Sequence, residues 1–328
     1  MTDSRAESRG LALGLLGVAF FALTVPMTRL AVGPAEAPEL PPFFVAFGRA
    51  ALAGLLSCAY LAVVGAARPR REHMASFAVC ALGTVVGFPL LLGLALRHVD
   101  AVHAAVVTGV LPLATAIVAA IAFRQRPSPG FWLCAVAGAA LVVAFAAWKG
   151  SGALVLADAL LLGSVASAAV GYVAGARLAA RMPAERVICW VLVGSLPLTV
   201  PAMLLTWPAQ AASAAAWGGF AYVTVFSMWL GFFAWYRGLA LGGTLRVSQV
   251  QLVQPFLAML FAVPLLGERL DAGTVAFALA VVATVFVGRL ASAGTPAANA
   301  RIAHDAAGFR RSASNAAAAG PAHLGSTR

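Results

Sequence analysis

The chain has 328 residues, of which 62% are hydrophobic and only 10% are charged, with a formal net charge of +11. A water-soluble domain usually has about a quarter of its residues charged. With a mean hydropathy of +0.93, this composition excludes a soluble globule and indicates apolar surface that faces lipid. The positive charges form short clusters between apolar runs, with no basic stripe interleaved with aromatic residues, so we expect no nucleic-acid partner.

Ten apolar segments approach the length of about 20 residues that a membrane-spanning helix requires. Polar or proline-containing breaks separate them, such as residues 68–71 and 181–183. We therefore predict an all-α integral membrane protein with ten transmembrane helices. In chain order the predicted spans are 11–31, 42–65, 75–96, 102–123, 131–148, 153–175, 187–207, 217–236, 247–267 and 272–290.

The distribution of positive charge predicts the orientation in the membrane. The first span is longer than a signal-peptide core, so we expect it to be retained as a membrane helix. If the N-terminus (residues 1–10) is cytoplasmic, most arginines also face the cytoplasm, as the positive-inside rule requires. Ten spans then put the C-terminus in the cytoplasm too, and residues 292–328, rich in Ala, Gly and Ser, predict a disordered tail there. The opposite side would hold only Arg29, Arg97, Lys149 and Arg269.

The two halves of the chain resemble each other. Gly-Leu-Ala-Leu occurs at 93–96 and again at 238–241, and Val-x-Pro motifs follow at similar distances in both halves. Each unit contains five helices, an odd number, so the second unit must enter the membrane from the opposite side. We predict two inverted repeats, 11–148 and 149–291, an organisation typical of secondary transporters.

Charged side chains within or beside the spans are costly in lipid, so each indicates a functional site or a satisfied structural contact. Arg49 either bonds to carbonyls or a carboxylate of the bundle, or binds an anionic substrate. Asp158 is the only carboxylate well within a span, which makes it the leading candidate for proton coupling. Its alternative is a helix-start residue at the interface. Glu268 is a second coupling candidate, although a local ion pair or cap beside Arg269 and Asp271 is favoured.

Polar residues of the ninth span share one helical face. Ser248, Gln251 and Gln254 are three residues apart, and Pro255 should free a backbone carbonyl within the helix. We predict that this face binds substrate and that the proline is a hinge. The alternative is hydrogen bonding between helices, which also favours Ser, Thr and Gln in membrane bundles.

The fourth span repeats this arrangement. His103 and Thr108 precede Pro112, which we predict to be the matching hinge beside a central, pseudosymmetric substrate cavity. Histidine in general can change charge near neutral pH, but a lone histidine near a helix end, such as His103, is more often structural. Further candidates for substrate binding are Tyr172 and Tyr236, with Thr24, Thr28 and Trp235 as secondary choices.

The run from 235 to 240, Gln254-Pro255 and the stretch 266–270 together resemble the EamA-type family of drug/metabolite transporters. Arg49 and Ala157-Asp158 fit the same pattern, and the similarity extends over residues 11–290. The resemblance implies a carrier in the cytoplasmic membrane, often an exporter of amino acids or other metabolites, that uses neither ATP nor a bound metal. One departure is Gln125, where the family usually has a second glutamate.

Together these patterns predict a secondary transporter that exports an amino acid or related metabolite across the cytoplasmic membrane by alternating access. Its expected partners are the substrate, the lipid bilayer and protons as coupling ion, and a homodimer stays open. The alternatives are a broad-specificity exporter of drugs or amphiphiles, and a non-transport intramembrane protein. The sequence shows no clustered catalytic groups, metal-ligand spacing or phosphate-binding loop, so we expect no enzymatic activity, cofactor or metal.

Overall fold

The computed structural model describes residues 2–124, 127–149, 156–179, 181–242, 247 and 250–293. All regular structure in these residues is helical. Eight segments are long and apolar enough to cross a membrane, and two shorter apolar helices, Val250–Leu266 and Ala272–Gly288, follow them. The predicted all-α architecture of about ten membrane helices is therefore confirmed.

The first half of the chain supplies the first five spans, three of which are divided into shorter helical pieces. The first span breaks at Leu23, the third contains a π-helical segment, and the fourth breaks at Gly109 and Val110. The elements of the first half are α1 (Thr2–Ala22), α2 (Thr24–Val32), α3 (Pro42–Val63), η1 (Arg71–His73), α4 (Met74–Cys80), η2 (Ala81–Gly87), α5 (Phe88–Ala95), α6 (Ala101–Thr108), α7 (Leu111–Ala122) and α8 (Pro129–Lys149).

The second half supplies the remaining spans, and its third span again contains a π-helical segment, η3. Its elements are α9 (Leu156–Ala179), α10 (Ala184–Leu205), α11 (Ala214–Tyr222), η3 (Val223–Leu230), α12 (Gly231–Gly242), η4 (Val250–Val253), α14 (Gln254–Leu266) and α15 (Ala272–Ala293).

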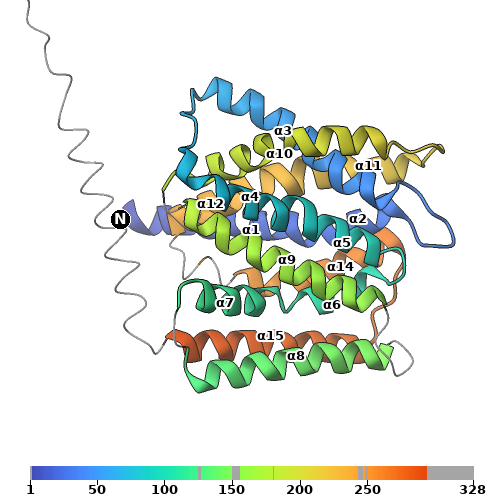
Figure 1. The fold of residues 1–328 in the computed structure, drawn as a ribbon. Helices are drawn as coiled ribbons and strands as arrows, with labels where there is room; N and C mark the ends of the chain where they lie inside the picture. Colours follow the sequence, from blue (N-terminus) through green and yellow to red (C-terminus); the bar gives the residue numbers. More distant parts are fainter. Residues whose placement is uncertain are drawn as a thin grey trace, which may run out of the picture.

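The helices run along a common direction, and their connections gather at the two ends of the bundle (Figure 1). The last helix of each half, α8 and α15, lie side by side at one edge of the molecule, below α6 and α7. The elements α2, α6, α9 and α14 lie between this pair and the group formed by α3, α10 and α11. The helices α2, α6 and α14, each part of a divided span, are therefore inside the bundle.

Apolar side chains also cover much of the outer surface. Leu133 is 72% exposed and Leu205 is 86% exposed. A water-soluble monomer seldom leaves such side chains exposed over a large continuous area, whereas lipid is a favourable environment for them.

Glycine allows α9 and η2 to approach each other closely. A Cβ atom added at Gly171 would lie 2.8 Å from the backbone nitrogen of Thr84 and 3.0 Å from the carbonyl carbon of Gly83. Both distances are too short for an ordinary contact. Small residues at helix interfaces are the usual means of close packing in membrane proteins, and here they join the third span to the sixth.

Candidate functional site

Two broken helices, one from each half, meet in the interior. Helix α6 ends at Thr108, and α7 begins three residues later, at Leu111, with Pro112 in its first turn. Similarly, the 3₁₀ segment η4 leads into α14, which has Pro255 in its first turn. Proline suits the first turn of a helix because its missing N–H has no intrahelical partner there.

The position of Pro255 in the first turn of α14 corrects the expectation that it would free a carbonyl within a continuous helix. Pro255 does not interrupt a continuous ninth helix, because the chain changes from the 3₁₀ turn of Val250–Val253 to the α-helix at Gln254. The three-residue spacing of Gln251 and Gln254 still keeps them on one face, since a 3₁₀-helix has three residues per turn. Ser248, predicted on the same face, lies outside the described residues.

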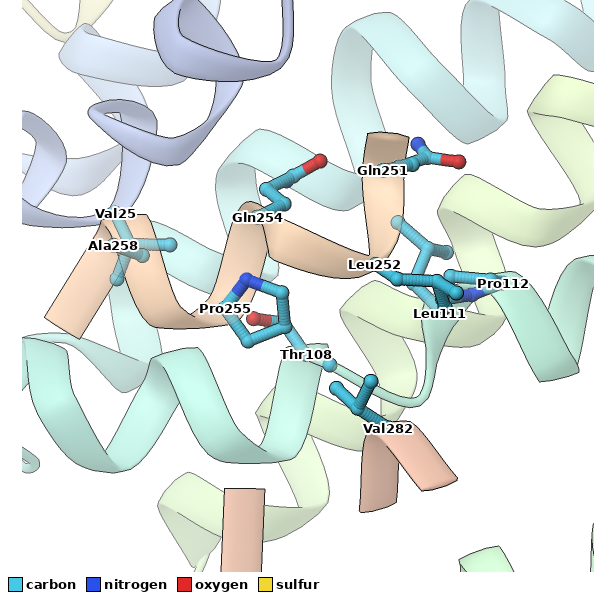
Figure 2. A pocket seen from close by; sticks show the side chains of 11 residues that line it. Val25, Thr108, Leu111, Pro112, Gln251, Leu252, Gln254, Pro255, Ala258 and Val282 are labelled. Atoms are coloured by element: carbon cyan, nitrogen blue, oxygen red, sulfur yellow. The ribbon is translucent and has the colours of Figure 1, made fainter. Parts of the chain in front are cut away.

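A cavity, here called the proline cavity, lies where the two broken helices meet (Figure 2). It takes in about 410 Å³ of space not filled by atoms, part of it open to the outside. Five residues predicted to bind substrate or act as hinges line it together. The lining is Val25, Thr108, Gly109, Leu111, Pro112, Gln251, Leu252, Gln254, Pro255, Ala258 and Val282.

A second cavity, the arginine cavity, adjoins the first and takes in about 530 Å³ of space not filled by atoms, part of it open to the outside. The two cavities share Val25, Thr108, Leu111 and Gln254. The remaining lining comes from both halves of the chain and includes three further predicted residues, Thr24, Arg49 and Tyr172. The complete lining is Phe21, Thr24, Val25, Arg49, Thr84, Phe88, Thr108, Leu111, Tyr172, Ser227, Met228, Phe232 and Gln254.

Within the arginine cavity a polar chain connects the two halves. Arg49 Nη2 donates to Ser227 Oγ at 3.0 Å. Because an arginine can only donate, the Ser227 hydroxyl is free to donate to Thr24 Oγ1, 2.7 Å away. Thr24 in turn is 3.4 Å from the carbonyl oxygen of Phe20. Ser227 was not among the predicted site residues, although it is a polar residue within an apolar span, the same signal that identified the others.

His103 lies outside both cavities and instead contacts Asp158. Its Nε2 is 2.7 Å from Asp158 Oδ1, the Asp158 side chain is 1% exposed, and the imidazole ring packs against Phe145 at a centroid distance of 5.0 Å. His103 is in the first turn of α6, and Asp158 is in the first turn of α9. The structure therefore brings together two residues that the sequence suggested for different roles, substrate binding and coupling.

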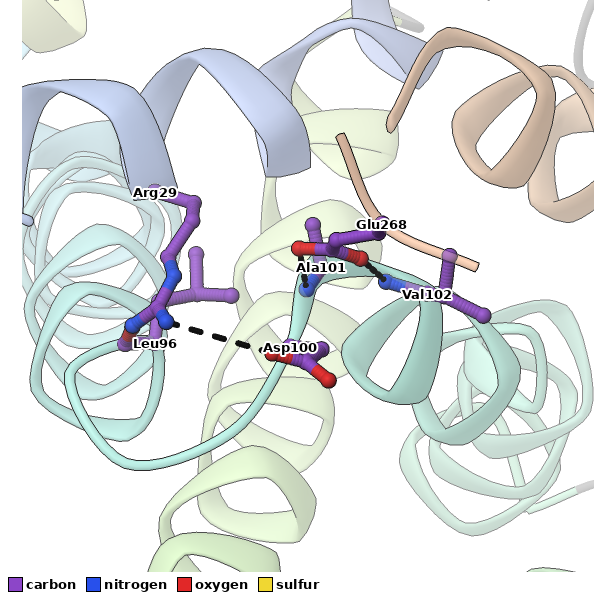
Figure 3. Close-up of polar contacts among 6 residues, drawn as sticks. All are labelled: Arg29, Leu96, Asp100, Ala101, Val102 and Glu268. Atoms are coloured by element: carbon purple, nitrogen blue, oxygen red, sulfur yellow. Dashed lines mark hydrogen bonds and ion pairs between the residues drawn. The ribbon is translucent and has the colours of Figure 1, made fainter. Parts of the chain in front are cut away.

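Glu268 caps a helix of the other half rather than forming the favoured local contact. Its two carboxylate oxygens accept hydrogen bonds from the backbone N–H groups of Ala101 and Val102, each at 2.7 Å (Figure 3). Burial raises the pKa of Glu268 above its usual value, while these two hydrogen bonds act in the opposite direction. Beside this cap, Arg29 donates to the carbonyl of Leu96 and lies 3.9 Å from a carboxylate oxygen of Asp100. The α14–α15 connection is thus attached to the start of α6.

Asp271 caps its own helix, α15, by accepting from Thr274 N at 2.9 Å, and it pairs with Lys149 Nζ at 2.5 Å. The hydrogen bonds from Lys149 and Thr274 hold the pKa of Asp271 below its usual range.

The remaining predicted residues lie away from the cavities. Tyr236 packs against Phe232 at a ring-centroid distance of 5.7 Å and lines neither cavity. Thr28 is buried in α2 but also lies outside both linings, and Trp235 contacts α1 at Gly17. Gln125 and the predicted tail from residue 294 onward fall outside the described residues.

Comparisons with known proteins agree with the fold. Residues 8–146 and 155–288 each match the EamA-like transporter family. The chain is 41% identical over 284 residues to the "Uncharacterized transporter YdeK" of Bacillus subtilis (strain 168), an alignment that covers 86% of this chain and 97% of the relative. A solved structure described as "Crystal structure of protein" is similar in fold, with a TM-score of 0.58 at 19% identity over 87% of this chain and 99% of the other. The chain therefore belongs to the EamA-like transporter family, as a multi-pass membrane protein that transports a small molecule.

Proposed function

We propose that this transporter is a secondary carrier that exports a small metabolite, an amino acid or related compound, across the cytoplasmic membrane by alternating access. The observation that carries the proposal is the meeting of α6–α7 and η4–α14 at the proline cavity. Interrupted membrane helices are tolerated where they line a cavity, and substrate sites of secondary transporters are typically formed by such helices at the interface of two repeats.

The correspondence between the halves supports alternating access. The third span contains a π-helical segment, Ala81–Gly87, and the eighth span contains another, Val223–Leu230. The fourth and ninth spans are both interrupted just before a proline, and the family matches twice along the chain. Two equivalent halves of opposite orientation exchange conformations around a central site. The repeat boundaries of 11–148 and 149–291 and the cytoplasmic termini are part of this proposal.

We further propose that protons drive transport through the buried pair of Asp158 and His103. The contact is short, almost inaccessible and joins α6 to α9, so a change in its protonation alters the charge between two packed helices. Asp158→Asn in proteoliposomes should abolish the response of transport to a pH gradient while leaving substrate exchange measurable. A full response to the gradient in this variant would contradict the coupling role.

The carrier itself is tested by counterflow in proteoliposomes. A thermal-shift screen of amino acids, organic acids, nucleosides and cationic dyes first selects ligands, since binding to the folded state raises its apparent stability. Transport of selected metabolites against empty-liposome controls supports the proposal. Uptake of many unrelated cationic dyes instead would favour the broad-specificity alternative, and no flux of any ligand would oppose a carrier.

Two glycine substitutions test the location of the site. A Cβ at Gly109 would lie 3.1 Å from Pro255 Cγ, at the wall of the proline cavity, whereas nothing lies within 4 Å of a Cβ at Gly194. We expect Gly109→Leu to obstruct the cavity and abolish counterflow, and Gly194→Leu, on the lipid-facing surface of α10, to retain it. Equal activity of the two variants would place the transport route elsewhere.

A further inference from the structure

Arg49 is a buried cation whose donors are mostly unused. The residue lies within α3 and is only 2% exposed. Nη2 donates to Ser227 Oγ at 3.0 Å and lies 3.5 Å from the sulfur of Met228. The buried Nε and Nη1 atoms have no acceptor among the described residues. Three of the five N–H donors of a guanidinium are therefore unpaired.

No carboxylate of the described residues compensates this charge. The ion pairs in that part of the chain join Arg29 to Asp100, Glu72 to its neighbours Arg70 and His73, His103 to Asp158, and Lys149 to Asp271, and Arg49 is in none of them. A guanidinium stays protonated at any physiological pH, and an unpaired charge away from water is costly. A bound anion would remove most of that cost.

The surroundings hold the guanidinium in place. The hydroxyl of Ser227 accepts from Arg49 and lies 2.7 Å from Thr24 Oγ1, so residues from three separate elements, α2, α3 and η3, fix one edge of the group. The unpaired Nε and Nη1 are on the same side chain that lines the arginine cavity. Such a fixed, partly unpaired guanidinium is suited to a carboxylate, whose oxygens accept several N–H groups at once.

The other residues that line the arginine cavity indicate the charge and the polarity of the ligand that it would bind. Arg49 is the only charged residue in its described lining, and the wall also carries the aromatic rings of Phe21, Phe88, Phe232 and Tyr172. A ligand with one negative charge and an apolar body matches these groups. A dianion such as a phosphate ester or dicarboxylate would bring a second charge that no lining cation balances.

We propose that Arg49 anchors the carboxylate of an organic monoanion whose apolar body occupies the aromatic part of the arginine cavity. The inference rests on the proposed carrier function and, within the related compounds named there, specifies a monocarboxylate rather than a zwitterionic amino acid, because the described lining has no acidic side chain for an ammonium group. In this arrangement Arg49 binds the charged group, Ser227 and Thr24 position the guanidinium, and the rings contact the body of the ligand.

The test uses sets of probes that share an apolar body and carry an anionic, a neutral or a cationic head group. One set is phenylacetate, its neutral amide and the phenethylammonium cation; the other is isocaproate, its amide and isohexylammonium. Binding to the purified full chain in nanodiscs is measured by calorimetry at neutral pH. We expect at least one carboxylate to bind about tenfold more tightly than its amide or amine, a difference of about 1.4 kcal/mol.

Arg49→Gln should reduce the affinity for that carboxylate to the level of the amide, while affinity for the amide stays within about twofold of the unmodified protein. Retained amide binding also shows that this variant is folded. Arg49→Lys keeps the charge and should retain part of the preference. The matched control is Arg177→Gln, an exposed arginine whose Nη2 donates to the carbonyl of Ala122 at 2.7 Å, and it should keep the whole preference.

The proposal is overturned if no carboxylate of the panel binds, if the amides or amines bind as tightly as the carboxylates, or if Arg49→Gln keeps the anion preference. Counterflow separates this outcome from failure of the carrier proposal. Transport of neutral or cationic compounds without any carboxylate preference would leave the carrier and remove the anion site. A carboxylate preference without flux of any compound would leave the anion site and remove the carrier.

Discussion

The cap that Glu268 forms on α6 provides a direct test of how the two halves are joined. Ala101 N and Val102 N each donate to a different carboxylate oxygen at 2.7 Å. The first N–H groups of a helix have no intrahelical partner, and a carboxylate there is also favoured by the helix dipole. We expect Glu268→Ala to release the α14–α15 connection from the start of α6.

The size of the effect follows from the two hydrogen bonds. A hydrogen bond to a charged group contributes about 1.5–3 kcal/mol, but Glu268 is only half-buried, so water replaces part of what is lost. We therefore expect a total of about 2 kcal/mol, which is a factor of about 30 in an equilibrium constant. Glu268→Gln keeps one acceptor oxygen and turns an amide NH₂ towards the second backbone donor, so it should lose about half of this free energy.

Hydrogen–deuterium exchange of the purified transporter measures this change at the capped amides. In Glu268→Ala the amides of Ala101 and Val102 should exchange about 30-fold faster, and in Glu268→Gln about fivefold faster. The control is Glu72→Gln at the other end of the third span, where the carboxylate is exposed and lies 3.7 Å from Arg70. An exposed pair of this kind contributes little, so exchange at α6 should not change.

If the two amides exchange at the same rate in Glu268→Ala and in the unmodified protein, the cap does not hold α6, and the reasoning fails. If exchange accelerates as expected, the same variant becomes informative for transport. Should the α14–α15 connection leave α6 in the alternate conformation, the variant would populate that conformation more often, and its counterflow rate would change while substrate affinity at the cavities would be retained.

Three further predictions concern packing, the cavity and acid stability. Gly171→Ala places a methyl group 2.8 Å from a backbone nitrogen of η2 and should cost about 2 kcal/mol, seen as a lower melting temperature; Gly194→Ala, with open space around it, should not. Gln251→Ala should weaken substrate binding more than Thr206→Ala, which removes a hydroxyl that donates to the carbonyl of Ala202 and lies outside both cavity linings, and equal effects would argue against a ligand contact at Gln251. Asp271→Ala should lower stability by about 1 kcal/mol through loss of a cap. Because the pKa of Asp271 is depressed, its contribution is present above the unfolded pKa of about 3.9 and is lost as the pH falls through the folded value. Thermal unfolding should therefore show the difference from the variant shrinking only below about pH 4.

The architecture was predictable because the bilayer imposes a length and a polarity on each element. Runs such as 42–65 and 75–96 predicted helices that the structure places at Pro42–Val63 and Arg71–Ala95, and no soluble fold competes for so apolar a sequence. The internal breaks were harder to predict. Pro255 indicated an irregularity, but its residue type does not distinguish a kink within one helix from the start of a new one.

Contacts between helices were the least predictable part of the site. His103 and Asp158 are 55 residues apart in the chain, and their individual spans do not determine how α6 and α9 are rotated towards each other. For the same reason Glu268 was assigned to a local contact with its sequence neighbours, although its hydrogen-bond partners are 166 and 167 residues away. Spacing along one helix identifies a shared face, but it carries no information about the partner of that face.

Arg49 shows how the two kinds of information combine. A permanent cation within an apolar span is recognisable in the sequence, but both a structural role and a substrate clamp satisfy that observation equally well. The two roles differ only in whether the guanidinium already has its acceptors. The structure gives it one hydroxyl, in Ser227, and a weak sulfur contact, and leaves Nε and Nη1 without a described partner. Since a purely structural arginine in lipid would be expected to pair its donors, the unpaired atoms favour an acceptor that arrives from outside the chain.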